Sequence, residues 1–521
     1  MWRKNLLFII AVVLVSQFLV HLPDYLRWKN TPSDLWFTGQ VSWFDPWDQN
    51  VYFSAIGWGR RAGLVFQNLY DAQSEKPIQI YGVYTALGRI FSALPVSNAA
   101  IFHISVIFLN FILAVVVWWF LQIFLPKNID RKVSFVLIFL GAGLGWLFFP
   151  GIVLPDLGQP GFMFESATRR PHEAVSIGFF LLTIGTLWKG GFGKRKLYLI
   201  LAGFSSFIAF YFHPYSVLTL GGMFVSFGIY SLFNESGWGQ LFKNPLKTPF
   251  GQVMLTFGVS GSLYMLAFGL QMLKDPSSSG LVGQIQYSPN PIYAVLGWGI
   301  LFPFVLITLI TPIEDRKINF LKLWFISQFL IIYIPLGFQK LLIRGLWVVV
   351  VMLAILGVEI IATKFKLRQG VLLVFILLFV CIGNLFIFAN KVSEPNTNRW
   401  INLSNGEKEI VDFLYDNGQK EEGVLASYRV ANIIPANTNK RVYAGHEFQT
   451  PDFKSRIAEV NKFYEGQMTD QEAKDFFKKA RVVWVFWGPD EKAIGYLENI
   501  PNNGLFDTIL QTGKASLYKI K

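Results

Sequence analysis

Several ionisable residues of this sequence stand where apolar segments end, in short stretches that also contain aromatic residues. The stretch FDPWDQNVYF, residues 44–53, holds Asp45 and Asp48 three positions apart, and Tyr52 follows Asp48 by four positions. A carboxylate in such a place acts as a general base when it reaches the proton that it removes. The two aspartates are therefore candidate catalytic residues.

Basic residues and histidines recur in three further stretches of the same kind, RRPHEA, FHPYS and GFQKLLIRG. The candidates in these stretches are Arg169, Arg170, His172, Glu173, His213, Lys340 and Arg344. Arginine binds phosphate through charge-assisted and often bidentate hydrogen bonds. These residues are therefore candidates for binding a substrate that carries a phosphate group.

Each candidate also has a structural interpretation, which the sequence leaves open. Asp48 is placed to cap a helix, and the Asp45–Pro46 step is typical of a turn. The arginines beside Glu173 fit a salt-bridged loop, and Arg344 fits a side chain that snorkels to the membrane surface.

The composition indicates the class of protein. The chain has 521 residues, of which 53% are hydrophobic and 15% are charged, whereas soluble domains carry about 25% charged residues. Apolar runs of about 20 residues recur, and this is the length of a membrane-spanning helix. The sequence therefore predicts a polytopic α-helical membrane protein, integral to the cytoplasmic membrane and surrounded by membrane lipids.

The net charge of +13 does not indicate a nucleic-acid partner, and we expect none. The lysines and arginines lie in short loops between apolar runs, not in one basic patch. The single cysteine, Cys381, lies within an apolar run and says nothing about the redox compartment. The first apolar segment is not followed by a small-residue cleavage site, so we expect a retained helix.

About 11 transmembrane helices are predicted. They lie near residues 5–22, 99–125, 133–154, 173–188, 197–212, 214–233, 250–273, 292–312, 318–338, 341–362 and 369–390. Basic residues fall in every second loop, which the positive-inside rule assigns to the cytoplasm. The N-terminus is then cytoplasmic, the C-terminus is extracytoplasmic, and the candidate residues lie at the outer face.

Two domains are predicted from the change in composition along the chain. Residues 1–390 form the transmembrane domain, in which residues 23–98 are a long first outer loop with stretches suited to interfacial helices. Residues 391–521 form a soluble extracytoplasmic domain. At roughly 130 residues, this second domain is large enough to bury a core of its own.

The soluble tail has the patterns of a small α/β domain. Ser404 with Glu407, and Thr469 with Glu472, have the spacing of capping boxes at the starts of helices. Four short apolar runs, GVLAS, RVYAG, RVVWVFWG and ASLYKI, are strand candidates. Alternating strands and helices predict an α/β arrangement.

DQNVY, residues 48–52, resembles the first outer loop of the GT-C superfamily of polytopic membrane glycosyltransferases. That loop often carries an acid, then Glu or Gln, and an aromatic residue a few positions on. RRPHEA, FHPYS and FQKLLIRG are similar to outer-face segments of bacterial members, and RVYAGHEFQTPDF (441–453) is similar to their soluble C-terminal domain. The likeness covers most of the chain in architecture but only short stretches in sequence.

The resemblance implies an enzyme that moves a sugar from a polyprenyl-phosphate donor to an extracytoplasmic acceptor, which is a glycan, a lipid or a protein. Asp48 would deprotonate the acceptor hydroxyl, with Asp45 as its neighbour, and Tyr52, at the aromatic position of the pattern, would bind substrate. The arginines would stabilise negative charge on the departing lipid phosphate. Direct displacement with inversion would need only one base.

The sequence departs from the family in its acids. DPWD is not the closely spaced acid pair of some members, and the metal-binding acidic pair of the oligosaccharyl-transferring members is not evident. We therefore expect no cofactor and favour a metal-independent reaction, with a divalent metal ion as the alternative.

Other functions remain open. A transporter or flippase for lipid-linked sugars would show inverted repeats and polar residues at mid-membrane, and the sequence shows no clear repeat. A polysaccharide polymerase or ligase would use the same outer-face site. A non-enzymatic membrane scaffold would tolerate substitution of Asp48 and Arg344.

Overall fold

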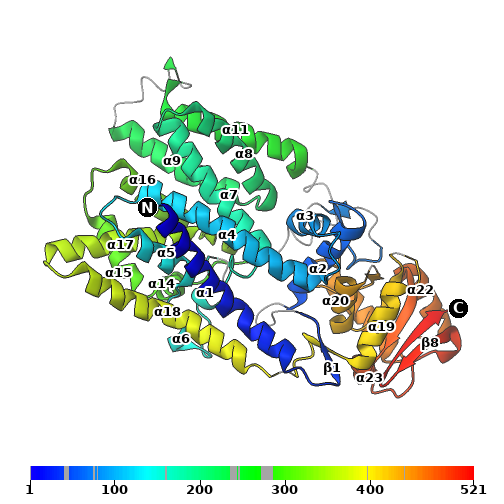
Figure 1. The fold of residues 1–521 in the computed structure, drawn as a ribbon. Helices are drawn as coiled ribbons and strands as arrows, with labels where there is room; N and C mark the ends of the chain where they lie inside the picture. The colour runs from blue at the N-terminus through cyan, green and yellow to red at the C-terminus, as the bar shows by residue number, and fades with distance from the viewer. Residues whose placement is uncertain are drawn as a thin grey trace. The chain divides into compact units, whose positions relative to one another are not determined.

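The structure is a computed structural model that divides into two compact units (Figure 1). It describes residues 2–39, 46–73, 77–78, 80–158, 161–234, 243–244, 247–270, 285–395, 397–419, 421–438 and 440–521. The helical unit comprises Met1–Leu22, Val106–Gln271 and Ile285–Lys391. The mixed unit comprises Pro23–Ser105, Met272–Gln284 and Val392–Lys521.

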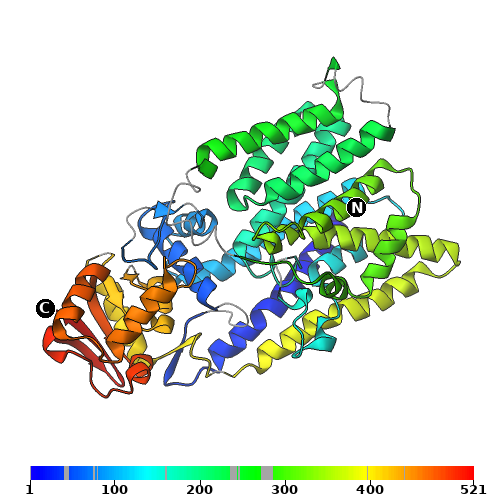
Figure 2. The same ribbon diagram turned by 180° about the vertical axis from the view of Figure 1, so that it is seen from behind.

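The helical unit is built from apolar helices. They are α1 (Trp2–Lys29), α4 (Asn98–Phe124), α5 (Arg131–Leu140), α6 (Gly145–Phe148), α7 (Pro171–Leu187), the π-helix η2 (Trp188–Phe192), α8 (Lys196–Phe212), α9 (Ser216–Asn234), α11 (Pro249–Tyr264), the π-helix η4 (Met265–Gly269), α14 (Pro291–Trp298), α15 (Leu301–Ile310), α16 (Arg316–Ile331), α17 (Leu346–Lys364) and α18 (Gln369–Ser393). The helices α1 and α4 are continuous and contribute residues to both units. Figures 1 and 2 show α8, α9 and α11 side by side.

Within the described residues, eight helices are long and apolar enough to cross a membrane. A ninth span results if α14 and α15, which are bent by 103°, count as one. The shorter helices α8 and α16 occupy the two remaining predicted segments. Every predicted span therefore coincides with a helix or a broken helix, and the chain is a membrane protein. The total of about 11 spans and their orientation stay predictions.

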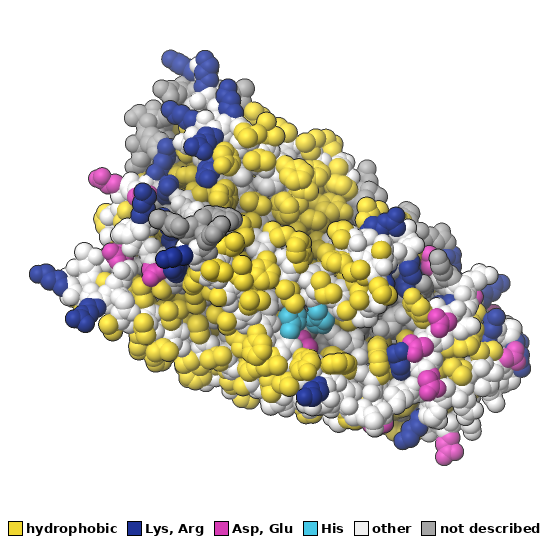
Figure 3. Space-filling view, viewed as in Figure 1, with side chains coloured by type: hydrophobic (Ala, Val, Ile, Leu, Met, Phe, Trp, Pro, Cys, Tyr) yellow, Lys and Arg dark blue, Asp and Glu magenta, His cyan; other side chains and the backbone are white. Residues whose placement is uncertain are grey.

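The centre of the helical unit is α17, whose sequence LWVVVVMLAILGV is apolar on all sides. A helix of this kind is stable only where it is buried all round, and every residue from Leu346 to Val358 is buried. Gly357 lets α15 approach closely, because a Cβ there would lie 2.1 Å from the carbonyl oxygen of Phe304. Large apolar side chains elsewhere on the helices remain exposed and form the broad hydrophobic surface in Figure 3, as expected for contact with lipid.

A buried carboxyl group shapes the break between α5 and α6. Asp156 lies on the 3₁₀ helix η1 (Pro155–Leu157), and its Oδ2 accepts hydrogen bonds from the backbone N–H groups of Gly143 and Gly145, both at 2.9 Å. Burial raises the pKa of Asp156 from 3.8 to about 6, although these hydrogen bonds act in the opposite direction. The carboxyl group therefore supplies acceptors to a loop that has no regular hydrogen bonding of its own.

Replacing Asp156 with alanine is expected to lower the free energy of unfolding by about 2–6 kcal/mol, because two buried N–H groups lose their acceptor at about 1–3 kcal/mol each. Asp156→Asn keeps a carbonyl oxygen and should retain most of the stability. Because the folded-state pKa is raised, this group contributes stability below about pH 4 that is lost as the pH rises through about 6. Unfolding of the detergent-solubilised protein at pH 5 and pH 7 should show this loss in the wild type and not in Asp156→Asn. Equal stability of wild type and Asp156→Ala would contradict the assignment.

The mixed unit combines the first loop with the tail. Its elements in the loop are β1 (Leu35–Phe37), α2 (Pro46–Arg61), β2 (Phe66–Gln67), β3 (Pro77–Ile78) and α3 (Gly82–Ile90). Those in the tail are β4 (Asn402–Ser404), α19 (Asn405–Asp416), β5 (Gly423–Leu425), α20 (Tyr428–Asn437), β6 (Arg441–Val442), α21 (Phe453–Tyr464), α22 (Asp470–Ala480), β7 (Val482–Trp487), α23 (Pro489–Gly495), β8 (Phe506–Thr512) and β9 (Ala515–Ile520).

The tail forms a five-stranded sheet in the order β6-β5-β7-β9-β8, visible at the red end of the chain in Figure 1. The first three strands are parallel, and β9 and β8 are antiparallel additions. Side chains alternate between the faces of the sheet, so Leu425 and Val485 pack with α21 and α22. Trp484 packs instead against Phe413 of α19 on the other face. The predicted α/β character of the tail is thus confirmed.

The sequence located most elements of the tail. Both capping boxes are present, at Ser404 with Glu407 and at Thr469 with Glu472. All four strand candidates contain a strand. The strand β8 was not predicted, because FDTILQT has one buried residue at its start and then mostly exposed ones, so it lacks the apolar alternation of a half-buried strand.

The first loop and the tail are joined by backbone hydrogen bonds. Strand β1 pairs antiparallel with β4, with Trp36 opposite Leu403. The N–H of Val442 donates to the carbonyl oxygen of Leu69, and the N–H of Ala72 donates to the carbonyl oxygen of Val442. The helix α2, part of a stretch in which we expected interfacial helices, buries its apolar side chains inside the mixed unit and packs against α3 and α20.

Candidate active site

Asp48 lies in the first turn of α2, which begins at Pro46. Proline suits the first helical position because its missing N–H would have no partner there. A carboxylate in the first turn is stabilised by the helix dipole. The helix α2 fixes the position of Asp48. The Asp48 side chain is 36% exposed, so it is still accessible to a substrate. The other predicted acid, Asp45, lies outside the described residues.

The partner of Asp48 is His446, in the loop after β6. His446 Nε2 lies 2.9 Å from Asp48 Oδ1, and the histidine side chain is 1% exposed. The backbone N–H groups of Phe448 and Gln449 point at His446 Nδ1, at 3.1 and 3.3 Å. Since Nδ1 accepts these bonds, the proton of the neutral imidazole is on Nε2 and is donated to Asp48. The imidazole therefore orients the carboxylate.

The loop that carries His446 is held against α2 by buried amides. Asn50, in the first turns of α2, donates to Asn432 Oδ1 at 2.6 Å, and Asn432 donates to the carbonyl oxygen of Gly445 at 2.8 Å. Thr450 Oγ1 accepts from the N–H of His446 and donates to the carbonyl oxygen of Tyr70. Buried polar networks with satisfied partners are rigid, so the Asp48–His446 pair is preorganised.

Aromatic side chains line the same part of the mixed unit. Tyr52, one turn after Asp48, stacks on Tyr84 with ring centroids 4.4 Å apart and an interplanar angle of 10°. The Tyr70 ring meets the His446 ring edge-on at 5.9 Å. Burial, together with the negative charge of Asp48, raises the pKa of Tyr81 well above its usual range. The Tyr81 hydroxyl group therefore keeps its proton at neutral pH.

In the helical unit, Glu173 and Arg344 form a bidentate ion pair. Glu173 lies in the first turn of α7, and Arg344 follows the 3₁₀ helix η5 (Gln339–Ile343). Arg344 Nε donates to Glu173 Oε2 at 2.6 Å, and Nη2 donates to Oε1. The side chains are 1% exposed for Glu173 and 13% for Arg344. The sequence suggested an ion pair between Glu173 and the arginines beside it. Glu173 does form an ion pair, but its partner is Arg344 and not Arg169 or Arg170.

His213 completes this cluster. Arg344 Nη1 donates to His213 Nε2, and His213 Nδ1 lies 3.1 Å from Ser216 Oγ. Since a guanidinium can only donate, the imidazole carries its proton on Nδ1. Burial, and then the charge of Arg344, holds the pKa of His213 well below its usual range, so it stays neutral. His172 Nε2 lies 3.4 Å from Glu173 Oε1, the same carboxylate oxygen that Arg344 Nη2 contacts.

The remaining basic candidates lie on neighbouring segments of the helical unit. Arg169 Nη2 is 2.9 Å from Glu165 Oε1, and Arg170 immediately precedes α7. Burial raises the pKa of Glu165 to about 6, against the opposing charges of the two arginines. Lys340 lies on η5, four residues before Arg344. The helical unit therefore gathers Glu173, His172, His213 and Arg344 in one cluster, with a second ion pair close by in the sequence.

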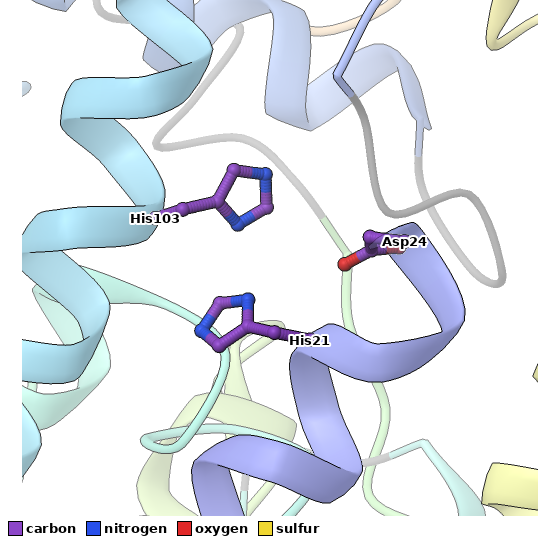
Figure 4. A group of neighbouring side chains, drawn as sticks. All are labelled: His21, Asp24 and His103. Carbon is purple, nitrogen blue, oxygen red and sulfur yellow. The ribbon is translucent and has the colours of Figure 1, made fainter. Parts of the chain in front are cut away.

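Two metal-ligating side chains of α1 lie near one of α4 (Figure 4). Asp24 and His103 belong to the mixed unit, and His21 lies one turn before Asp24 on the unbroken helix α1. One ligand atom from each residue lies within 4.8 Å of the others. His21 Nε2 pairs with Gln17 Oε1, and His103 Nε2 pairs with the carbonyl oxygen of Gly39. Two imidazoles and a carboxylate suit zinc, so the preference for a metal-independent reaction is unsupported.

The carboxyl ends of the parallel strands in the tail form a switch point between β5 and β7, where open α/β sheets bind ligands. Here Glu491, which is fully buried, occupies that position. Its Oε1 accepts from the N–H of Ser427 at 2.8 Å, and its Oε2 accepts from the N–H of Gly488 at 3.0 Å. The chain's own carboxylate thus takes the place of an anionic ligand.

From the sequence alone, His446 fits loop structure better than a functional role, and it is not among the candidate site residues. It is separated from Asp48 by 398 positions, and no local pattern links the two. The only sequence signal was its place in RVYAGHEFQTPDF, just after a predicted strand.

Comparison with known proteins gives structural neighbours only. No family model and no curated protein matches the sequence. The oligosaccharyltransferase of Archaeoglobus fulgidus tethered with an acceptor peptide is similar at 13% identity, with a TM-score of 0.53 over 92% of this chain and 69% of that chain. ArnT from Cupriavidus metallidurans is similar at 9% identity, with a TM-score of 0.52 over 99% of this chain and 98% of that chain.

A second structure of the archaeal enzyme, AglB in complex with an inhibitory peptide and a dolichol-phosphate, has a TM-score of 0.51 at 12% identity over 93% of this chain and 70% of that chain. AglB and ArnT are both membrane glycosyltransferases of the GT-C superfamily. The chain therefore has the GT-C fold, and the resemblance seen in the sequence is confirmed at the level of the fold.

Proposed function

We propose that this protein is a GT-C-type glycosyltransferase that moves a sugar from a polyprenyl-phosphate donor to an extracytoplasmic glycan, lipid or protein. The observation that carries the proposal is the Asp48–His446 pair, an accessible carboxylate oriented by a buried imidazole within a GT-C fold. The neighbours support the donor class, because one was solved with a dolichol-phosphate and another with an acceptor peptide.

In the proposed reaction, the Asp48 carboxylate takes the proton of the acceptor hydroxyl. The acceptor oxygen forms a bond to the anomeric carbon of the sugar while the bond from that carbon to the phosphate oxygen breaks. The lipid phosphate leaves with the electron pair, and basic side chains stabilise its charge. The candidates for this role remain Arg169, Arg170, His172, Lys340 and Arg344, with Tyr52 against the sugar or acceptor. His213 is neutral and accepts from Arg344 Nη1, so its proposed part in substrate binding is to hold that guanidinium in place. Glu173 would hold the Arg344 guanidinium in one orientation.

The proposal is tested with wild-type protein reconstituted in liposomes. Each liposome batch receives one radiolabelled polyprenyl-phosphate sugar or the matching nucleotide sugar, together with membrane extracts as a source of acceptor. We expect label to move from the lipid-linked donor to an acceptor, with no transfer from the nucleotide sugar. Movement of intact lipid-linked sugar across the bilayer without transfer would favour a flippase.

His446→Ala is expected to reduce transfer by about 10–100-fold, because the donor that orients Asp48 is lost. That donor also favours the ionised carboxylate, so the acidic limb of the pH–rate profile should move to higher pH in the variant. His446→Gln, which restores a side-chain N–H donor, should recover part of the rate. The measurement is transfer rate against pH for the three proteins. An unchanged profile in His446→Ala would show that the histidine only supports the fold.

A further inference from the structure

A cavity of about 640 Å³ opens in the helical unit, and none of the candidate residues considered so far lines it. It is lined by the end of α4, the end of α7 with the π-helix η2, and the start of α16. Its walls include Trp119, Trp188, Phe192, Lys189, Arg316 and Lys317. The cavity therefore combines aromatic walls with three cationic side chains.

The aromatic rings hold two of the cations in place. Lys189 Nζ lies 5.1 Å from the ring centroid of Trp119 and 5.2 Å from that of Tyr198. Arg316 Cζ lies 4.5 Å from the ring centroid of Phe192. Contacts at these distances are attractive cation–π interactions. The two charges are thus placed at the cavity by the fold and do not extend freely into solvent.

One acidic residue, Asp315, also lines the cavity, but its carboxylate is engaged as the N-cap of α16. Asp315 Oδ1 accepts from the backbone N–H groups of Lys317 and Ile318, at 2.7 and 3.2 Å, and so caps α16. With three cations and one carboxylate, the lining carries a net charge of plus two. This charge favours an anionic occupant.

The location decides which anion fits. Lys189 belongs to the KGGFGKRK loop, and Arg316 and Lys317 belong to EDRK, two of the loops that the charge bias assigns to the cytoplasmic side. The helix α8, which packs against η2, exposes an apolar stripe beside them, made of Leu197, Ile200, Leu201 and Phe204. Basic pockets between transmembrane helices on this side suit anionic lipid headgroups.

We propose that this cavity binds the phosphate headgroup of an anionic phospholipid. The phosphate lies between Lys189 and Arg316, and the acyl chains run along the apolar stripe of α8. This site is distinct from the proposed donor site, since it uses none of the residues assigned to catalysis.

The test is native mass spectrometry of the full-length protein in detergent, titrated with phosphatidylglycerol or phosphatidylcholine. We expect wild type to bind phosphatidylglycerol at least tenfold more tightly. Lys189→Gln/Arg316→Gln should lose at least tenfold in phosphatidylglycerol affinity and leave phosphatidylcholine binding unchanged. The matched control is Lys364→Gln/Arg368→Gln, in the segment from the last residue of α17 to the residue before α18. Lys364 also lies over an aromatic ring, and the control should behave as wild type.

Three outcomes would overturn the proposal. The first is equal binding of the two lipids by wild type, a result that needs no variant to fold. The second is an equal loss in the control pair, which would show a bulk charge effect. The third is displacement of phosphatidylglycerol by equimolar inorganic phosphate, which would make the occupant a free anion and not a lipid.

Discussion

Asp48→Asn is expected to lower the rate of sugar transfer by about 10²–10⁴-fold, the usual contribution of a general base. The amide oxygen of asparagine can still accept the hydrogen bond from His446 Nε2, so the variant should fold and keep the loop of His446 in place. The measurement is initial transfer rate in liposomes, with thermal unfolding as the check on folding.

The matched control is Asp412→Asn, which changes a 56% exposed aspartate on α19 in the same unit. It should transfer at the wild-type rate. If Asp48→Asn folds and transfers as well as this control, then Asp48 is structural and the proposed mechanism is wrong. Loss of transfer in Asp45→Asn, with Asp48→Asn active, would instead move the base to Asp45.

Glu173→Ala is expected to destabilise the helical unit by about 3–5 kcal/mol, because the largely buried Arg344 would lose its counter-charge. Replacing both partners by apolar residues, as in Glu173→Ala/Arg344→Met, should recover most of that loss, since a buried pair is worth little against apolar packing. The measurement is the free energy of unfolding in mixed detergent micelles.

The control for these two variants is Glu359→Ala, which also replaces a glutamate by alanine, at a partly buried position on α17. It should change stability by less than about 1 kcal/mol. If the double variant is as unstable as Glu173→Ala, then the uncompensated charge of Arg344 is not the cause of the lost stability. Transfer activity in the stable double variant then reports separately whether Arg344 contacts the substrate.

Local patterns in the sequence predicted local features well. The spacing of Ser404 and Glu407 identifies a helix start because a capping box needs only four residues. The length of each apolar run identified the membrane helices, because that length is also read from one continuous stretch of sequence. The broken helix α14–α15 was predicted as one span, since Gly299, with a φ of +60°, turns the chain without changing the apolar run.

The contacts of the candidate site could not be predicted, because they join residues far apart in the chain. Glu173 and Arg344 are separated by 171 positions, and their pairing depends on how α7 meets the segment before α17. The sequence indicated that these residues were unusual for a membrane segment, but it gave no means of choosing Arg344 over the nearer Arg169 and Arg170.

The mixed unit is assembled from two segments of the chain that are made at different times. Strand β1 and Asp48 belong to the first segment, and their partners, β4 and His446, belong to the second. About 290 residues separate the segments, which at about 5–20 residues per second corresponds to about 15–60 s of translation. During that interval the membrane helices are inserted, and β1 in the first loop has no β4 to pair with. The nascent chain therefore cannot orient its base, and the proposed activity begins only when synthesis of the protein is almost complete.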